Sequence, residues 1–115
     1  MTSGIRTITY PVKDLDAATA LYGRLLGVEP YMKQPYYVGF RPEGAPEIGL
    51  DPNGHAQGHT GPVTYWRVGD IAASVAELIA AGAEEVQAVR DVGGGNLTAT
   101  VRDADGNVTG LYQGK

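Results

Sequence analysis

The sequence predicts an α+β fold made of two tandem β-α-β-β-β modules. The first observation is a repeat: a strand, an acidic corner, a helix and a glycine recur in the same order and at nearly the same spacing in both halves. The second is that three short strand patterns follow each helix pattern. The third is the length of 115 residues, which suits one domain rather than two independent ones. We therefore expect a single domain over residues 1–115, with module one over 4–50, a linker over 51–61 and module two over 62–113.

The first module opens with an alternating strand pattern over residues 5–12 and continues with a helix over residues 16–26. Asp14 or Asp16 can cap this helix by accepting hydrogen bonds from its free backbone N–H groups, and Gly27 suits a left-handed helix end. The apolar residues of the helix recur at steps of three and four, which predicts one buried stripe made of Leu15, Ala18, Leu21, Tyr22, Leu25 and Leu26.

Three short strands follow this helix, and turns that contain proline or glycine separate them. We expect the strands over residues 29–32, 36–41 and 47–50. The glycine-rich segment DPNGHAQGHTG then links the two modules.

The second module repeats this order, with a strand over residues 62–68 and a helix over residues 72–81. Asp70 precedes the helix and Gly82 follows it, as at the first helix. Its apolar stripe consists of Ile71, Val75, Leu78 and Ile79. The last three strands are expected over residues 84–90, 96–102 and 107–113.

The composition excludes several classes of function. The net charge of −4 disfavours nucleic acid as a partner, and no apolar run approaches the ~20 residues that cross a bilayer. The first residues also lack the apolar core of a signal peptide. The absence of cysteine excludes disulfides, thiolate metal sites and cysteine nucleophiles, and it fits a cytoplasmic location.

Two segments, TITYPVKDLDAATALYGRLLGVEP in the first module and DADGNVTGLYQ at the end of the second, carry a family resemblance. Together with VTYWRVGDIAASVAELIAAGA they cover nearly the whole chain. This pattern resembles the vicinal oxygen chelate superfamily, which includes glyoxalase I, extradiol dioxygenases, fosfomycin-resistance enzymes and bleomycin-binding proteins. The resemblance implies a glyoxalase-like domain whose curved mixed sheets surround a cavity, with the helices outside, and it implies a homodimer.

The resemblance also implies four metal-ligand positions, one on the first and one on the last strand of each module. Four N or O side chains placed in this way leave open positions on a divalent ion for substrate oxygens. In this sequence the four positions fall on Thr7, Gly49, Val63 and Gly110. Valine and glycine carry no ligating side chain, and a lone threonine hydroxyl is a poor ligand. We therefore expect neither the standard metal site nor a cofactor.

Three other residues are candidates for a relocated site. His55 and His59 lie with Asp51 in the glycine-rich linker. The two histidines are either ligands of a non-standard metal site or solvated linker residues. We favour solvated linker residues, because a metal site needs rigid support. Glu47 lies on the same strand face as Gly49. It is either an acid of the cavity or an exposed charge at the start of a strand, and the exposed position is favoured.

Strand alternation selects the side chains that face away from the helices. On one strand these are Tyr37, Gly39 and Arg41, and the candidate ligand-binding residues over the whole chain are Thr9, Tyr37, Glu47, Tyr65, Arg67 and Tyr112. Aromatic walls with a guanidinium suit a small aromatic or anionic molecule. The alternative for each tyrosine is ordinary sheet packing, because aromatic residues favour strands. A one-residue slip in register would exchange Arg67 with Trp66, which we expect under the helix.

Three functions stay open on this basis. The leading hypothesis is a homodimer that binds a small organic molecule without a metal. The competing hypothesis is a lyase, isomerase or dioxygenase-type enzyme of the same superfamily that uses Tyr, Arg and Glu47 or a relocated metal site. The third is a structural or interaction module whose cavity is filled by side chains.

Overall fold

The computed structural model describes all 115 residues and contains two α-helices and eight strands. The chain forms two compact units, and we describe each by itself. The first unit comprises residues 7–63, and the second comprises residues 1–6 together with 64–115. Strand β1 (Thr2–Pro11) contributes its later residues to the first unit and its earlier residues to the second. The predicted α+β class is confirmed.

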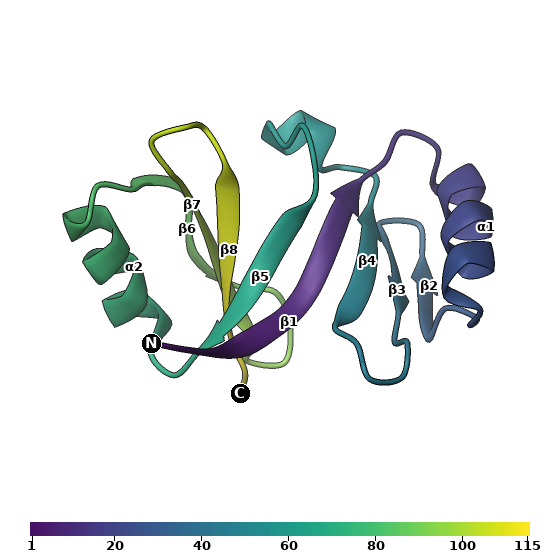
Figure 1. The fold of residues 1–115 in the computed structure, drawn as a ribbon, viewed down its shortest axis with the longest axis horizontal. Coiled ribbons are helices and arrows are strands. Elements are labelled where there is room, and N and C mark those ends of the chain that lie inside the picture. The colour runs from purple at the N-terminus through teal and green to yellow at the C-terminus, as the bar shows by residue number, and fades with distance from the viewer. The chain divides into compact units, whose positions relative to one another are not determined.

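In the first unit, four strands form a mixed sheet in the order β2 (Met32–Gln34), β3 (Tyr37–Phe40), β4 (Glu47–Asp51) and β1. Strand β4 runs parallel to β1, and the other neighbours are antiparallel. Helix α1 (Leu15–Leu26) packs against this sheet on one face (Figure 1). The other face of the sheet is therefore left for the side chains of alternate residues.

Helix α1 has the predicted start and end. The Asp14 side chain accepts a hydrogen bond from the backbone N–H of Ala17 at 3.0 Å, and Gly27 ends the helix in the left-handed region at φ 71°. Four of the six predicted stripe residues pack on a core of fully buried Val38, Phe40 and Leu50, namely Leu15, Ala18, Tyr22 and Leu26.

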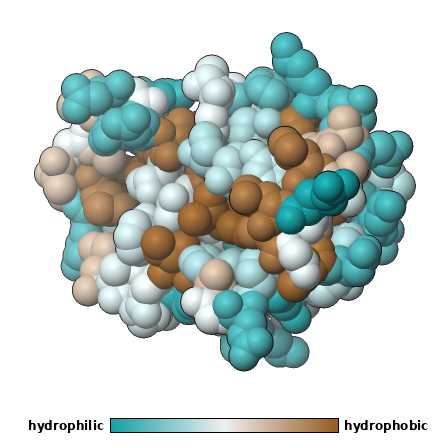
Figure 2. All heavy atoms as spheres, turned by 45° about the vertical axis from the view of Figure 1, so that its right-hand side comes forward, coloured by the Kyte–Doolittle hydropathy of each residue, from teal (hydrophilic) through white to brown (hydrophobic).

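The prediction is wrong for the other two residues of the stripe, because Leu21 and Leu25 are 63% and 72% exposed. At about 100° per residue they project to one side of the four residues that meet the core. Figure 2, which turns the side of α1 forward, shows apolar atoms in brown at the surface there.

In the second unit the strand order is β1, β5 (Val63–Val68), β8 (Val108–Gln113), β7 (Leu97–Arg102) and β6 (Glu84–Asp91). Strands β5 and β8 are parallel, whereas β8, β7 and β6 are joined antiparallel. Helix α2 (Ile71–Ala80) covers this sheet on one face (Figure 1).

Helix α2 is held at its start by two side chains. Asp70 accepts from the N–H of Ala73 at 3.1 Å, and the Gln113 side chain accepts from the N–H of Ile71 at 2.8 Å. The stripe residues Ile71 and Val75 are buried, as predicted. The prediction is wrong for Ile79, which is 44% exposed. The core of this unit consists of Val68, Ile71, Val75, Ala99, Val101 and Leu111. Neither helix of the chain is long and apolar enough to span a membrane.

The strand predicted over residues 29–32 is wrong apart from its last residue, because β2 begins at Met32. The register of Gln34 opposite Tyr37 places a two-residue turn between them, which fixes where the hairpin strands lie. Pro30 also has no backbone N–H to donate to a neighbouring strand. The first strand begins at Thr2, three residues earlier than predicted, and the other strands agree with the sequence to within one residue at each end.

Two leucines of the first unit provide a matched test of where its core lies. Leu50 is fully buried and Leu25 is 72% exposed. We expect Leu50→Ala to lower the free energy of unfolding by about 2–5 kcal/mol, because it removes buried apolar contacts and leaves a cavity. Leu25→Ala should change it by no more than about 0.5 kcal/mol. Urea unfolding followed by circular dichroism measures both, and equal losses in the two variants would contradict this core.

Candidate ligand-binding site

The sheet of the first unit presents polar and small residues on the face opposite α1. The pairing of β1 with β4 sets Thr7 beside Glu47 and Thr9 beside Gly49. Residues of the opposite parity, Tyr10 and Leu50, belong to the core beneath the helix. The alternation predicted from the sequence therefore describes this sheet correctly.

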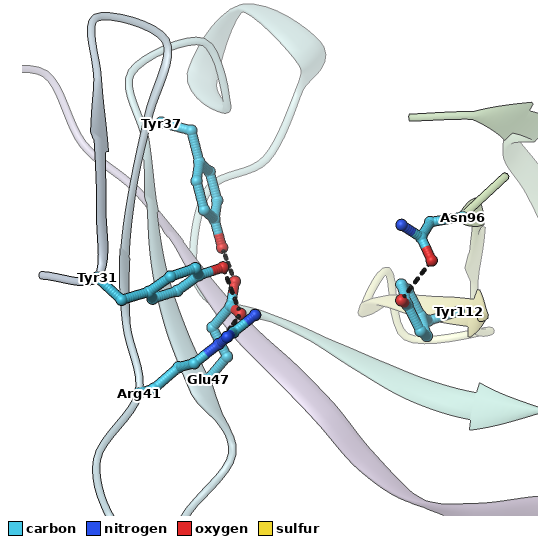
Figure 3. A network of polar contacts seen from close by, with 6 residues as sticks. All are labelled: Tyr31, Tyr37, Arg41, Glu47, Asn96 and Tyr112. Carbon is cyan, nitrogen blue, oxygen red and sulfur yellow. Dashed lines mark hydrogen bonds and ion pairs between the residues drawn. The ribbon is translucent and has the colours of Figure 1, made fainter. Parts of the chain in front are cut away.

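Glu47 is the centre of a polar cluster on this face (Figure 3). The Tyr31 hydroxyl donates to Oε1 of Glu47 at 2.8 Å, and the Tyr37 hydroxyl donates to Oε2 at 2.6 Å. Glu47 is only 8% exposed, so the expectation of an exposed strand-start charge is wrong. Strand β4 lies between β1 and β3, and the two tyrosines cover its first residue. The buried carboxylate is hydrogen-bonded, as burial of a charge requires.

Arg41 lies at the outer side of this cluster. Its Nε is 3.6 Å from Oε1 of Glu47, and its Cζ is 3.8 Å from the centre of the Tyr31 ring. The Arg41 side chain is 60% exposed, whereas that of Glu47 is 7% exposed. The positive charge of the pair therefore faces solvent and the negative charge is enclosed.

Glycines make room for the tyrosine rings. A Cβ on Gly49 would overlap the Tyr37 ring and hydroxyl, and a Cβ on Gly39 would lie 2.8 Å from the Tyr31 ring. In the second unit, a Cβ on Gly110 would overlap the Tyr65 ring in the same way. Two of the four expected metal-ligand positions are thus glycines against which a tyrosine is packed.

The residues present do not fit the metal site of the family pattern. No group of three or more His, Cys, Asp or Glu side chains comes together anywhere in the chain. Thr7 and the buried Val63 occupy the two first-strand positions. Neither strand glycine could be replaced by a ligating residue without displacing its tyrosine.

The second unit has its own cluster of aromatic and basic side chains opposite α2. The Tyr112 hydroxyl donates to Oδ1 of Asn96 at 2.8 Å (Figure 3), and the Arg6 guanidinium lies 5.0 Å from the centre of the Tyr112 ring. Arg67 is exposed, and its Nη1 donates to the carbonyl of Ile5 at 3.1 Å.

The register of this unit is the expected one. Tyr65 pairs with Gly110 and Arg67 with Tyr112, so these residues share a face. Trp66 packs against the core under the helix, so the one-residue slip that would exchange Trp66 with Arg67 does not occur.

The six predicted ligand-binding residues are divided between the units. Thr9, Tyr37 and Glu47 belong to the first, and Tyr65, Arg67 and Tyr112 to the second. Tyr31 is missing from the predicted set although it binds Glu47 directly. Tyr31 precedes β2, whereas the sequence prediction placed it inside a strand over residues 29–32, so the predicted alternation did not apply to it.

One of the two linker histidines differs from the prediction. His55 is exposed, but His59 is 4% exposed and is not a solvated linker residue. The chain turns back after a short 3₁₀ helix (His55–Gln57), and the backbone N–H of His59 donates to the carbonyl of Gly54 at 3.0 Å. Burial lowers the pKa of His59 from the ordinary value of 6.5, and the Asp51 carboxylate opposes this in part. Its Nε2 has no hydrogen-bond partner.

Residues 4–111 match the Glyoxalase/Bleomycin resistance protein/Dioxygenase superfamily. The chain belongs to this superfamily. The sequence has no significant match among curated proteins.

Solved structures of the superfamily share the fold. Methylmalonyl-CoA epimerase from Mycobacterium tuberculosis is 18% identical, with a TM-score of 0.74 over 99% of this chain and 89% of its own. A glyoxalase/bleomycin resistance protein/dioxygenase superfamily member from Vibrio splendidus 12B01 is 19% identical, with a TM-score of 0.70 over 95% and 97%. A Mn(II)-bound glyoxalase from Novosphingobium aromaticivorans is 24% identical, with a TM-score of 0.72 over 97% of this chain and 39% of its own.

The contact between Gly110 and Tyr65 can be tested by a double-mutant cycle. We expect Gly110→Ala to lower the free energy of unfolding by about 1–3 kcal/mol, because the added methyl group displaces a packed ring. The loss should be smaller in a Tyr65→Ala background, where the ring is absent. Gly69→Ala is the control, since a Cβ there meets nothing within 4 Å. Urea unfolding of the set gives the coupling, and an equal loss in both backgrounds would disprove the contact.

The buried imidazole predicts a pH dependence of stability. The folded-state pKa of His59 is below its unfolded value, so the unfolded chain takes up the proton first as the pH falls. The contribution of His59 is therefore complete above about pH 6.5 and declines at lower pH. We expect His59→Gln to flatten the dependence of the unfolding free energy between about pH 7.5 and 5.5, with exposed His55→Gln as the control. An unchanged slope in His59→Gln would refute the assignment.

Proposed function

We propose that this chain binds a small aromatic or anionic organic molecule on the sheet faces opposite its helices, without the metal site of catalytic superfamily members. The observation that carries the proposal is that tyrosine rings occupy two of the positions where the family pattern has metal ligands. Tyr37 packs on Gly49, and Tyr65 packs on Gly110. Tyrosine supplies apolar surface and a polar hydroxyl, which together suit recognition of an organic molecule.

The charged groups support the same proposal. Arg41 in the first unit and Arg67 in the second are exposed on or beside these faces, and guanidinium groups bind oxyanions through paired hydrogen bonds. Paired hydrogen bonds between a guanidinium and an oxyanion do not require a metal. The proposed ligand-binding set is therefore that of the sequence, Thr9, Tyr37, Glu47, Tyr65, Arg67 and Tyr112, with Tyr31 and Arg41 added.

The second candidate is an enzyme of the lyase, isomerase or dioxygenase type. The buried Glu47 between two tyrosine hydroxyls favours it, because enclosed carboxylates can exchange protons with a substrate. Structures with this fold include an epimerase and a glyoxalase.

We further propose a homodimer in the cytoplasm, with a small molecule rather than nucleic acid or a membrane as its partner. The net charge of −4 and the absence of cysteine support these assignments. The superfamily resemblance supports the dimer.

Native mass spectrometry of the gently purified protein tests these proposals together. We expect a dimer mass without stoichiometric Zn, Ni, Mn or Fe, and elemental analysis serves as the independent check on metal. A co-purified organic molecule would identify the ligand directly. One metal ion per chain would overturn the metal-free proposal, and conversion of the recovered molecule on incubation with the protein would favour the enzyme.

A further inference from the structure

The two opposite charges in the cluster of the first unit differ in what they offer to a ligand. The Glu47 side chain is 7% exposed, and both of its oxygens accept hydrogen bonds from tyrosine hydroxyls. A cationic ligand would have to displace these hydroxyls to reach the carboxylate. The Arg41 side chain is 60% exposed, so a ligand reaches the guanidinium without any rearrangement. The open charge of this face is therefore positive.

The Arg41 guanidinium is held in place by its neighbours. It lies over the Tyr31 ring at 3.8 Å, and Tyr31 is itself fixed by its hydrogen bond to Glu47 at 2.8 Å. The Nε of Arg41 is 3.6 Å from Glu47, which is an ion pair rather than a hydrogen bond. The two terminal nitrogens, Nη1 and Nη2, have no hydrogen-bond partner in the structure. A guanidinium fixed in this way loses less conformational freedom when it binds an anion than a mobile side chain does.

We propose that Arg41 binds a carboxylate group of the ligand, so that the small molecule bound by this chain is an organic carboxylic acid. This inference rests on the proposed function and specifies its ligand class. The two terminal nitrogens of Arg41 match the two oxygens of a carboxylate in one plane. The Tyr31 ring beneath the guanidinium and the Tyr37 ring of the same cluster provide surface for the apolar part of the acid.

A carboxylate is favoured over a phosphate by charge. Arg41 offers a single positive charge at the surface of the cluster, and the enclosed Glu47 already offsets this charge in part. The chain as a whole carries a net charge of −4, which repels a doubly charged phosphate more strongly than a singly charged carboxylate.

The test titrates the full chain with benzoate, with neutral benzamide of nearly the same shape, and with inorganic phosphate. Backbone amide NMR shifts report binding and its location. We expect benzoate to bind with a dissociation constant of about a millimolar, as suits so small a molecule, and to shift amides around Arg41 and Tyr31. Benzamide should bind at least about tenfold more weakly because it carries no negative charge for the guanidinium. Phosphate should also bind at least about tenfold more weakly, because the net charge of −4 repels its higher charge and it has no apolar part for the tyrosine rings.

Variants separate the guanidinium from general effects. Arg41→Gln should weaken the affinity for benzoate at least about tenfold and leave the affinity for benzamide unchanged. Arg41→Lys should recover only part of the loss, because lysine lacks the two parallel N–H donors of the guanidinium. Arg90→Gln, an exposed arginine of β6, is the matched control and should bind benzoate as the unaltered chain does. Dispersed amide spectra of every variant establish that it is folded.

Each other outcome counts against a particular statement. Equal binding of benzoate and benzamide, tighter binding of phosphate, or unchanged benzoate affinity in Arg41→Gln overturns the carboxylate inference and leaves the proposed function standing. If none of the three probes shifts any amide on the sheet faces, the inference and the proposed function both fail.

Discussion

The organisation of both sheet faces depends on one contact, a tyrosine ring lying directly against a glycine of a neighbouring strand. Tyr37 lies on Gly49 of β4, and Tyr65 lies on Gly110 of β8. Any side chain at these glycines would occupy the space of the ring, because protein interiors have no spare volume at this scale. In the first unit the contact also brings the Tyr37 hydroxyl to Glu47, and so determines how a charge can be buried there.

Burial of Glu47 in turn determines the charge that this face presents. A carboxylate removed from water loses hydration worth several kcal/mol unless hydrogen bonds and opposite charge replace it, and here two hydroxyls and Arg41 do so. Replacing one hydroxyl by hydrogen would remove a hydrogen bond to the enclosed Glu47 carboxylate. The tyrosines thus hold the negative charge inside, and the arginine that balances it remains at the surface. The electrostatic character of the face follows from packing rather than from the number of charged residues.

Much of this molecule can be predicted from its sequence, and the exceptions have a common cause. The repeat, the caps at Asp14 and Asp70 and the strand parity are local or periodic features, which are visible in the order of residues. Parity states which face a residue is on, but not what covers it. The burial of Glu47 depends on Tyr31 and Tyr37, which come from elsewhere in the chain, and Tyr31 lies outside the strand that was predicted to contain it.

The two glycines occupy equivalent places in the two modules, yet the rings that cover them come from different strands. In the second unit, Tyr65 of β5 is the direct strand neighbour of Gly110 on β8. In the first unit, the equivalent neighbour of Gly49 is Thr9 of β1, and the ring that covers Gly49 belongs to Tyr37 of β3. Duplication of a module therefore does not by itself explain why both positions are filled. In each unit a ligating side chain and a packed tyrosine exclude one another, because both need the volume above the same Cα atom. Each position can therefore hold either a metal ligand or a packed tyrosine ring, but not both. An acidic residue introduced at Gly49 or Gly110 alone would displace the ring without completing a metal site.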